Sequence, residues 1–116
     1  MHSKERDAAY LWDMLAAARE SQVLVEGVTL EMLMSDLRTR RALERTLELV
    51  GEAAARVSSQ TRSTHTEIPW AAIIGQRNII AHRYAAIDYG LLFATVTGNV
   101  PGLISALERI IGKLER

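Results

Sequence analysis

The feature that most constrains this chain is a regular apolar repeat in its second quarter. Apolar residues recur there at alternating steps of four and three, at Leu43, Leu47, Val50, Ala54 and Val57. This spacing places them on one stripe of an α-helix and matches the seam along which helices pack in bundles. No segment shows the two-residue alternation that is typical of a half-buried strand. The sequence therefore predicts an all-α fold.

Similar helical spacing recurs along the chain. Besides residues 36–58, which carry the repeat, helices are expected at 4–26, 30–34, 69–84, 89–98 and 101–114. Gly27 should end the first helix, and Thr29 and Asp88 should act as N-caps. The polar residues 58–66 lack a hydrophobic period and are expected to form a surface loop. The sequence therefore predicts an up-and-down bundle of four to five helices in one domain, residues 1–116.

The composition favours a self-associating protein that does not enter a membrane. Hydrophobic residues make up 48% of the 116 residues, which is enough for a core. A chain this short still leaves much apolar surface uncovered, so self-association is expected. No segment approaches the roughly 20 apolar residues that span a bilayer, and the N-terminus lacks the apolar run of a signal peptide. We therefore expect a cytoplasmic protein.

The charged and metal-binding residue types exclude several classes of function. The net charge at pH 7 is zero, which counts against an extended, non-specific nucleic-acid binder but not against an enzyme that grips RNA locally. The chain has no cysteine, so disulfides and thiolate chemistry are excluded. Its histidines are scattered and form no metal-ligand pattern. We expect neither a metal nor another cofactor.

A glycine inside the long helix indicates a close helix crossing. Gly51 costs about 1 kcal/mol there relative to alanine. Small residues surround it at Ala53, Ala54 and Ala55. A neighbouring helix that approaches closely would offset this cost. The helix expected at 69–84 is our candidate for that neighbour.

The helix at 69–84 carries the most distinctive chemistry. Arg77 lies within its broad apolar face, where a guanidinium is costly unless it is paired or bound to an anion. His82, five residues on, is the side-chain type best suited to proton transfer near neutral pH. An arginine that can hold phosphate and a histidine that can move a proton suggest phosphodiester chemistry.

The helical geometry separates these groups. Residues five apart differ by about 140° around a helix axis, so Arg77 and His82 point in different directions. Asn78 shares a side with His82, four residues away. One helix therefore makes a poor complete site. Two copies of the helix, crossing at a two-fold axis, would bring both sets together, so the geometry favours a homodimer.

Each candidate also has a purely structural explanation. Arg77 can form an internal ion pair with Asp36 or Glu52, and His82 can be a buried histidine bonded to a carbonyl.

The arginines of the long helix have two readings as well. Arg38, Arg41 and Arg45 can form a ridge that grips phosphate. They can equally be a solvated helix face whose ion pairs contribute a few tenths of a kcal/mol each.

The stretch from Arg77 to Tyr84 reads R-N-I-I-A-H-R-Y. It resembles the R-N-x-x-x-H-x-Y signature of HepT-type toxins, which belong to the HEPN class of small all-helical ribonucleases. Pro69-Trp70, Gly51-Glu52-Ala53 and Met34-Ser35-Asp36 also match the family pattern, as does the tail at 87–97. The resemblance thus covers most of the chain.

The resemblance implies metal-independent RNA cleavage at a dimer interface. The 2′-hydroxyl would attack the adjacent phosphorus and leave a cyclic phosphate. His82 would be the base or acid, Arg77 would neutralise the transition state, and Asn78 would orient His82 or bind the phosphate. We expect Arg83 to hold RNA, with Arg41 and Arg45 as further candidates.

The resemblance also implies a partner, and two alternative functions compete with the one that it implies. The partner is an MntA-like nucleotidyltransferase antitoxin, which adds AMP to the tyrosine of the motif, here Tyr84. The first alternative is a non-catalytic helical subunit that binds the nucleotidyltransferase and presents nucleotide to it. The second is a structural dimeric bundle in which Arg77 is merely paired. The intact motif favours the enzyme, and the neutral charge favours the binding subunit.

Overall fold

The computed structural model describes residues 3–115, except for the side chains of Ser3, Lys4 and Tyr84. Over this range the chain forms helices and their connections, with no strand. The α-helices are α1 (Ser3–Leu24), α2 (Leu30–Ser35), α3 (Leu37–Arg56), α4 (Ser59–Thr64), α5 (Trp70–His82), α6 (Tyr89–Gly98) and α7 (Val100–Leu114), and Tyr84–Ala86 forms the 3₁₀ turn η1. The expected all-α fold is confirmed.

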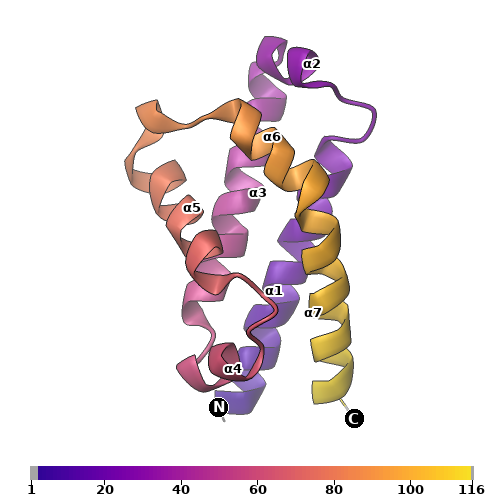
Figure 1. Ribbon diagram of the computed structural model, residues 1–116, viewed down its shortest axis with the longest axis vertical. Coiled ribbons are helices and arrows are strands. Elements are labelled where there is room, and N and C mark those ends of the chain that lie inside the picture. Colours follow the sequence, from indigo (N-terminus) through magenta and orange to yellow (C-terminus); the bar gives the residue numbers. More distant parts are fainter. Residues whose placement is uncertain (1–2, 116) are drawn as a thin grey trace.

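Five of the helices build the body of the bundle, and two short ones close its ends. The long helices α1 and α3 run antiparallel, with α7 beside α1 and α5 beside α3 (Figure 1). Helix α6 crosses the upper half obliquely, α2 lies at the top, and α4 lies at the bottom near the N-terminus (Figure 1). Because α3 and α5 are antiparallel, the C-terminal end of α5 lies toward the first half of α3.

The core lies mainly between α1, α3 and α7. The repeat that predicted a helix at 36–58 faces it: Leu43, Leu47, Val50, Ala54 and Val57 are all buried. From α1 come Leu11, Met14 and Leu15, and from α7 come Leu107, Ile110 and Ile111. Helix α5 contributes less, since Trp70 and Ile80 are its only buried residues.

Several predicted boundaries are confirmed, because short polar side chains satisfy the free N–H groups there. Thr29 caps α2 by accepting from the N–H of Met32, and Asp88 caps α6 by accepting from the N–H of Leu91. Gly27 follows the end of α1 with φ of 67°, a left-handed conformation that glycine adopts without strain.

Two local predictions are wrong. Part of the loop expected at 58–66 is the short helix α4, which depends on a distant side chain. Asp7 on α1 is buried, and its carboxylate accepts from the backbone N–H and hydroxyl of Ser58, at 2.9 and 2.6 Å, and from the hydroxyl of Thr61 at 2.5 Å. These bonds hold the first turn of α4 against α1.

The second error concerns the end of the helix expected at 69–84. Helix α5 stops at His82, and Arg83 leaves the helical region with φ of −128° and ψ of 50°. Ile80 is the last buried residue of α5, so the residues beyond it lack the packing that stabilises a helix. Tyr84 therefore lies in η1 and does not continue the Arg77 side of the helix.

Among the described residues, no single helix is long and apolar enough to cross a membrane. Helices α6 and α7 reach that length and apolarity only as a pair, which is bent by 46° at the break between them.

We predict that Asp7→Ala lowers the free energy of unfolding by about 2 kcal/mol at pH 7, because it leaves the half-buried donors of Ser58 and Thr61 without their acceptor. Burial raises the pKa of Asp7, but the hydrogen bonds from Ser58 and Thr61 outweigh it and hold the pKa below its usual 3.8. The stabilisation is therefore present above about pH 4 and is lost as the pH falls further.

Urea denaturation at pH 7 and pH 3 checks this. The control is Asp13→Ala, since Asp13 is exposed on the same helix, and this variant should have nearly the free energy of unfolding of wild type. An Asp7 variant as stable as the control at pH 7 would contradict the prediction.

Candidate active site

Helices α3 and α5 lie very close together at Gly51. A methyl group at this position would overlap the Cβ of Arg77 and come within 2.7 Å of its Cγ and 3.2 Å of the carbonyl oxygen of Ile73. The close crossing that was predicted at Gly51 is thus confirmed, with the predicted neighbour. Arg77 lies directly against the backbone of α3.

The Arg77 side chain is half-buried at this crossing. One terminal nitrogen, Nη1, donates to Oδ1 of Asn78 at 3.1 Å. Its Nε is fully buried and has no hydrogen-bond partner within the described part of the chain. The guanidinium is therefore not neutralised by a carboxylate of the described chain, and it keeps the capacity to bind an anion.

Asn78 and His82 lie on the exposed side of α5. They are four residues apart, so they share that side, as predicted. His82 is the last residue of the helix and Arg83 is its exposed C-cap. A proton-transfer group and a cation are therefore both open to solvent at one helix end. Tyr84 follows in η1, and its side chain lies outside the described part of the structure.

The structural alternatives for these residues do not hold within the described chain. Asp36 caps α3 and bonds to Thr39, and Glu52 faces Arg45 at 3.5 Å, so neither pairs with Arg77. His82 is exposed, so it is not a buried histidine bonded to a carbonyl.

Arg41 and Arg45 lie in ion pairs on α3. Arg41 contacts Glu44 at 2.8 Å, and Arg45 contacts Glu48 at 3.3 Å. Both arginine side chains remain about half exposed, at 46% and 58%. The ion-paired helix face is thus present, although each head group still reaches solvent.

A polar cluster that the sequence analysis missed lies where α3, α6 and α2 meet. Glu44 is buried, and it accepts from the hydroxyl of Tyr89 at 2.7 Å as well as from Arg41. Burial, followed by the hydrogen bond to Glu44, raises the pKa of the Tyr89 phenol. Arg40 lies 5.6 Å from the centre of the Tyr89 ring and donates to the carbonyls of Leu33 and Met34 at the end of α2.

A signal for this cluster was present in the sequence. Glu44 precedes Gly51 by seven residues, which is nearly two helical turns, so both lie on the same side of α3. An acid on the side where a helix crosses closely requires a partner from another element.

Helix α5 leaves one face uncovered. Its exposed residues recur at steps of three and four and include small, apolar and polar types: Ala71, Gly75, Asn78, Ile79 and His82. A mainly apolar cleft of about 670 Å³ flanks this face between α3, α5, α6 and α7. Ala72, Ile73 and Gln76 line it from α5, and Leu103 lines it from α7.

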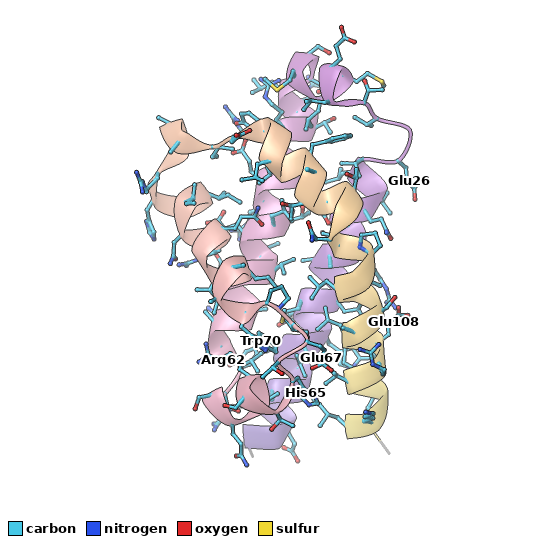
Figure 2. The ribbon with its side chains drawn as sticks, viewed as in Figure 1. Glu26, Arg62, His65, Glu67, Trp70 and Glu108 are labelled. Atoms are coloured by element: carbon cyan, nitrogen blue, oxygen red, sulfur yellow. The ribbon has the colours of Figure 1, made fainter. Side chains whose placement is uncertain are left out.

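The remaining described histidine lies elsewhere. His65, Glu67 and Trp70 lie near one another at the lower end of the bundle (Figure 2), and the indole of Trp70 donates to the carbonyl of His65 at 2.9 Å. This end is opposite to η1 (Figure 1). Among the described residues, no group of three or more His, Cys, Asp or Glu side chains is placed to hold a metal ion.

A small helical bundle with an arginine, an asparagine and a histidine near the end of one helix is the arrangement expected of a HEPN ribonuclease. Comparison with known proteins agrees, since a family model described as "Ribonuclease HepT-like" matches residues 14–110. The chain belongs to the HepT-like ribonuclease family, and the resemblance inferred from the sequence is confirmed.

Curated relatives cover nearly the same length. A protein of Methanocaldococcus jannaschii named "Putative RNase MJ1380" is 31% identical over 106 residues, which cover 91% of this chain and 97% of that protein. A protein of Thermococcus cleftensis named "Probable ribonuclease HepT" is 29% identical over 101 residues, covering 87% and 92%. No solved structure matches the chain.

Proposed function

We propose that this protein is a metal-independent endoribonuclease, the toxin of a pair with a nucleotidyltransferase antitoxin. The observation that carries the proposal is that the motif residues Arg77, Asn78 and His82 remain available to bind RNA. Arg77 has no carboxylate partner within the described chain, and Asn78 and His82 are exposed. Family membership and the names of the relatives support the same activity.

In the proposed reaction the 2′-oxygen of a ribose bonds to the adjacent phosphorus, and the bond from phosphorus to the 5′-oxygen breaks. His82 takes up the 2′-hydroxyl proton or delivers a proton to the leaving 5′-oxygen. Arg77 donates hydrogen bonds to the phosphoryl oxygens, where negative charge increases in the transition state. Asn78 orients His82 or binds the phosphate.

We further propose that the site is completed by a second copy of the chain. The exposed face of α5 supports this, because Ala71 and Gly75 allow another helix to come close and Ile79 adds apolar surface. A copy packed there would bring its own Asn78 and His82 to the same place. Arg77 of one copy would then act with His82 of the other.

The RNA strand outside the reacting phosphate needs further cations. Arg83 is exposed next to His82 and is the first candidate. Arg41 and Arg45 are proposed as outer contacts, since their head groups reach solvent but must share charge with acids of α3. We expect their loss to weaken RNA binding less than the loss of Arg83.

The pairing of Arg41 and Arg45 favours the second candidate function, a non-catalytic subunit that binds the nucleotidyltransferase and a nucleotide. Such a subunit needs no extended basic surface, in keeping with its zero net charge. The two functions differ in whether the purified protein cuts RNA.

His82→Ala and Arg77→Ala should each reduce RNA cleavage by about 100-fold to 10,000-fold, the usual range for removing a proton-transfer group or a transition-state donor. Initial rates on a labelled single-stranded RNA measure this. His65→Ala, at the opposite end of the bundle, is the control and should cleave like wild type.

RNA cleavage by the wild-type protein should persist in EDTA. Loss of activity in EDTA, restored by a divalent ion, contradicts the metal-free reaction.

The wild-type protein should be a homodimer by light scattering at micromolar concentration. Ile79→Glu should make it monomeric and inactive, because a charge in a closely packed helix contact is costly. Val23→Glu is the matched control, since Val23 is 64% exposed on α1.

Mixing tests whether the site is shared between copies. Arg77→Ala and His82→Ala are inactive alone, but a mixed dimer keeps one Arg77 and one His82, so activity should return. A mixture that exchanges subunits and stays inactive excludes the shared site.

We propose that attachment of AMP to Tyr84 neutralises the toxin. The added phosphodiester would compete with RNA for Arg77 and Arg83, and the base would occupy the space between the two copies of α5. Incubation with an MntA-like nucleotidyltransferase and ATP should therefore add AMP masses at Tyr84, and Tyr84→Phe should stay toxic beside the partner. Tyr89→Phe should still be modified. Neutralisation of Tyr84→Phe as complete as that of wild type would indicate simple steric binding instead.

A further inference from the structure

Gly51 differs from the other helical glycines of the described chain. Added methyl groups at Gly75, Gly98, Gly102 and Gly112 would meet nothing within 4 Å, and at Gly90 the nearest atom would be Oδ1 of Asp88 at 3.3 Å. At Gly51 the methyl would overlap Cβ of Arg77 and also press on its Cγ at 2.7 Å. The two atoms closest to an added side chain at position 51 thus belong to the stem of the arginine, and the carbonyl oxygen of Ile73 follows at 3.2 Å.

Two contacts restrict the Arg77 side chain, one with the backbone of α3 and one with Asn78. The Cβ and Cγ lie against the backbone of α3, and the next polar atom, Nε, is buried. Nη1 is held by Asn78 at 3.1 Å. The guanidinium therefore leaves the crossing along one path, toward the exposed side that carries Asn78 and His82.

We propose that Gly51 is a positioning residue for Arg77, and this inference rests on the function proposed above. Gly51 touches no substrate. It lets α5 lie close enough to α3 for the arginine stem to be fixed. The added methyl would lie 2.1 Å from Cβ of Arg77. Since carbon atoms settle about 3.5 to 4 Å apart, it would displace the stem by about 1.5 to 2 Å. A displacement of that size can reduce a rate by about 100-fold.

The experiment compares Gly51→Ala with Gly112→Ala, which makes the same change in a helix away from the site. Gly51→Ala should lower kcat for RNA cleavage by about 100-fold and change KM by less than about threefold, because the arginine acts mainly in the transition state. Gly112→Ala should cleave like wild type and melt at the same or a higher temperature. Wild-type kcat in Gly51→Ala overturns the proposal.

A combined variant separates positioning from general damage to the fold. If Gly51 acts through Arg77, then Gly51→Ala/Arg77→Gly, which also lacks the Cβ that the methyl would overlap, should be no slower than Arg77→Gly alone. If the losses multiply, Gly51 acts on activity by another route and the proposal fails.

A measurement on Arg77 itself does not depend on cleavage. The buried Nε–H of Arg77 should exchange slowly with solvent in wild type, as seen in nitrogen-edited NMR spectra, and much faster in Gly51→Ala. Unchanged exchange overturns the proposal. If wild type cuts no RNA but exchange behaves as expected, the proposed function fails while the control of Arg77 by Gly51 stands.

If Gly51→Ala does not fold, Gly51→Ala/Arg77→Gly decides, since it removes the atoms that the methyl would overlap. Recovery of a cooperative thermal transition supports the contact with Arg77. Continued failure to fold shows that the backbone at Ile73 excludes the methyl, and overturns the proposal.

Discussion

The position of α5 depends mainly on its packing against α3, and the two helices come very close at Gly51. The other long helices share a core in which α1 packs against both α3 and α7, but α5 has α3 as its main neighbour. Only two of its residues are buried. The close approach compensates for this small buried area, since every atom of the Arg77 stem that touches α3 adds dispersion contact. The residues proposed for catalysis therefore depend on the surface of a helix that carries none of them.

The start of α6, which follows α5 and η1 along the chain, is held against α3 by a different kind of interaction. A buried carboxylate is unfavourable unless it is paired and hydrogen-bonded, and Glu44 is satisfied by Tyr89 and Arg41. Tyr89 is the first residue of α6, so this bond anchors the start of α6 to α3. The connection between α5 and α6, which contains η1, is thus fixed at both ends.

Much of this arrangement could be predicted from local sequence. The helix starts at Thr29 and Asp88 follow from capping chemistry, and the helix crossing follows from a glycine that is costly within α3. The errors at α4 and Tyr84 have a common cause. Helix α4 is tied to Asp7, which lies 51 residues before Ser58, and α5 ends where its packing ends. Neither the long-range bond nor the missing neighbour leaves a periodic signal.

The two proposed catalytic groups are held to very different degrees. Arg77 is positioned inside its own chain, by atoms of α3 that a substitution on that helix can move. His82 ends α5 in solvent, and no hydrogen bond within the described chain fixes its ring. A general base or acid has to be held within hydrogen-bond reach of the proton that it moves. For His82 that restraint must come from outside the described monomer, from RNA or from a second copy on the open face of α5. Self-association would then control proton transfer, whereas the α3–α5 contact would control charge stabilisation.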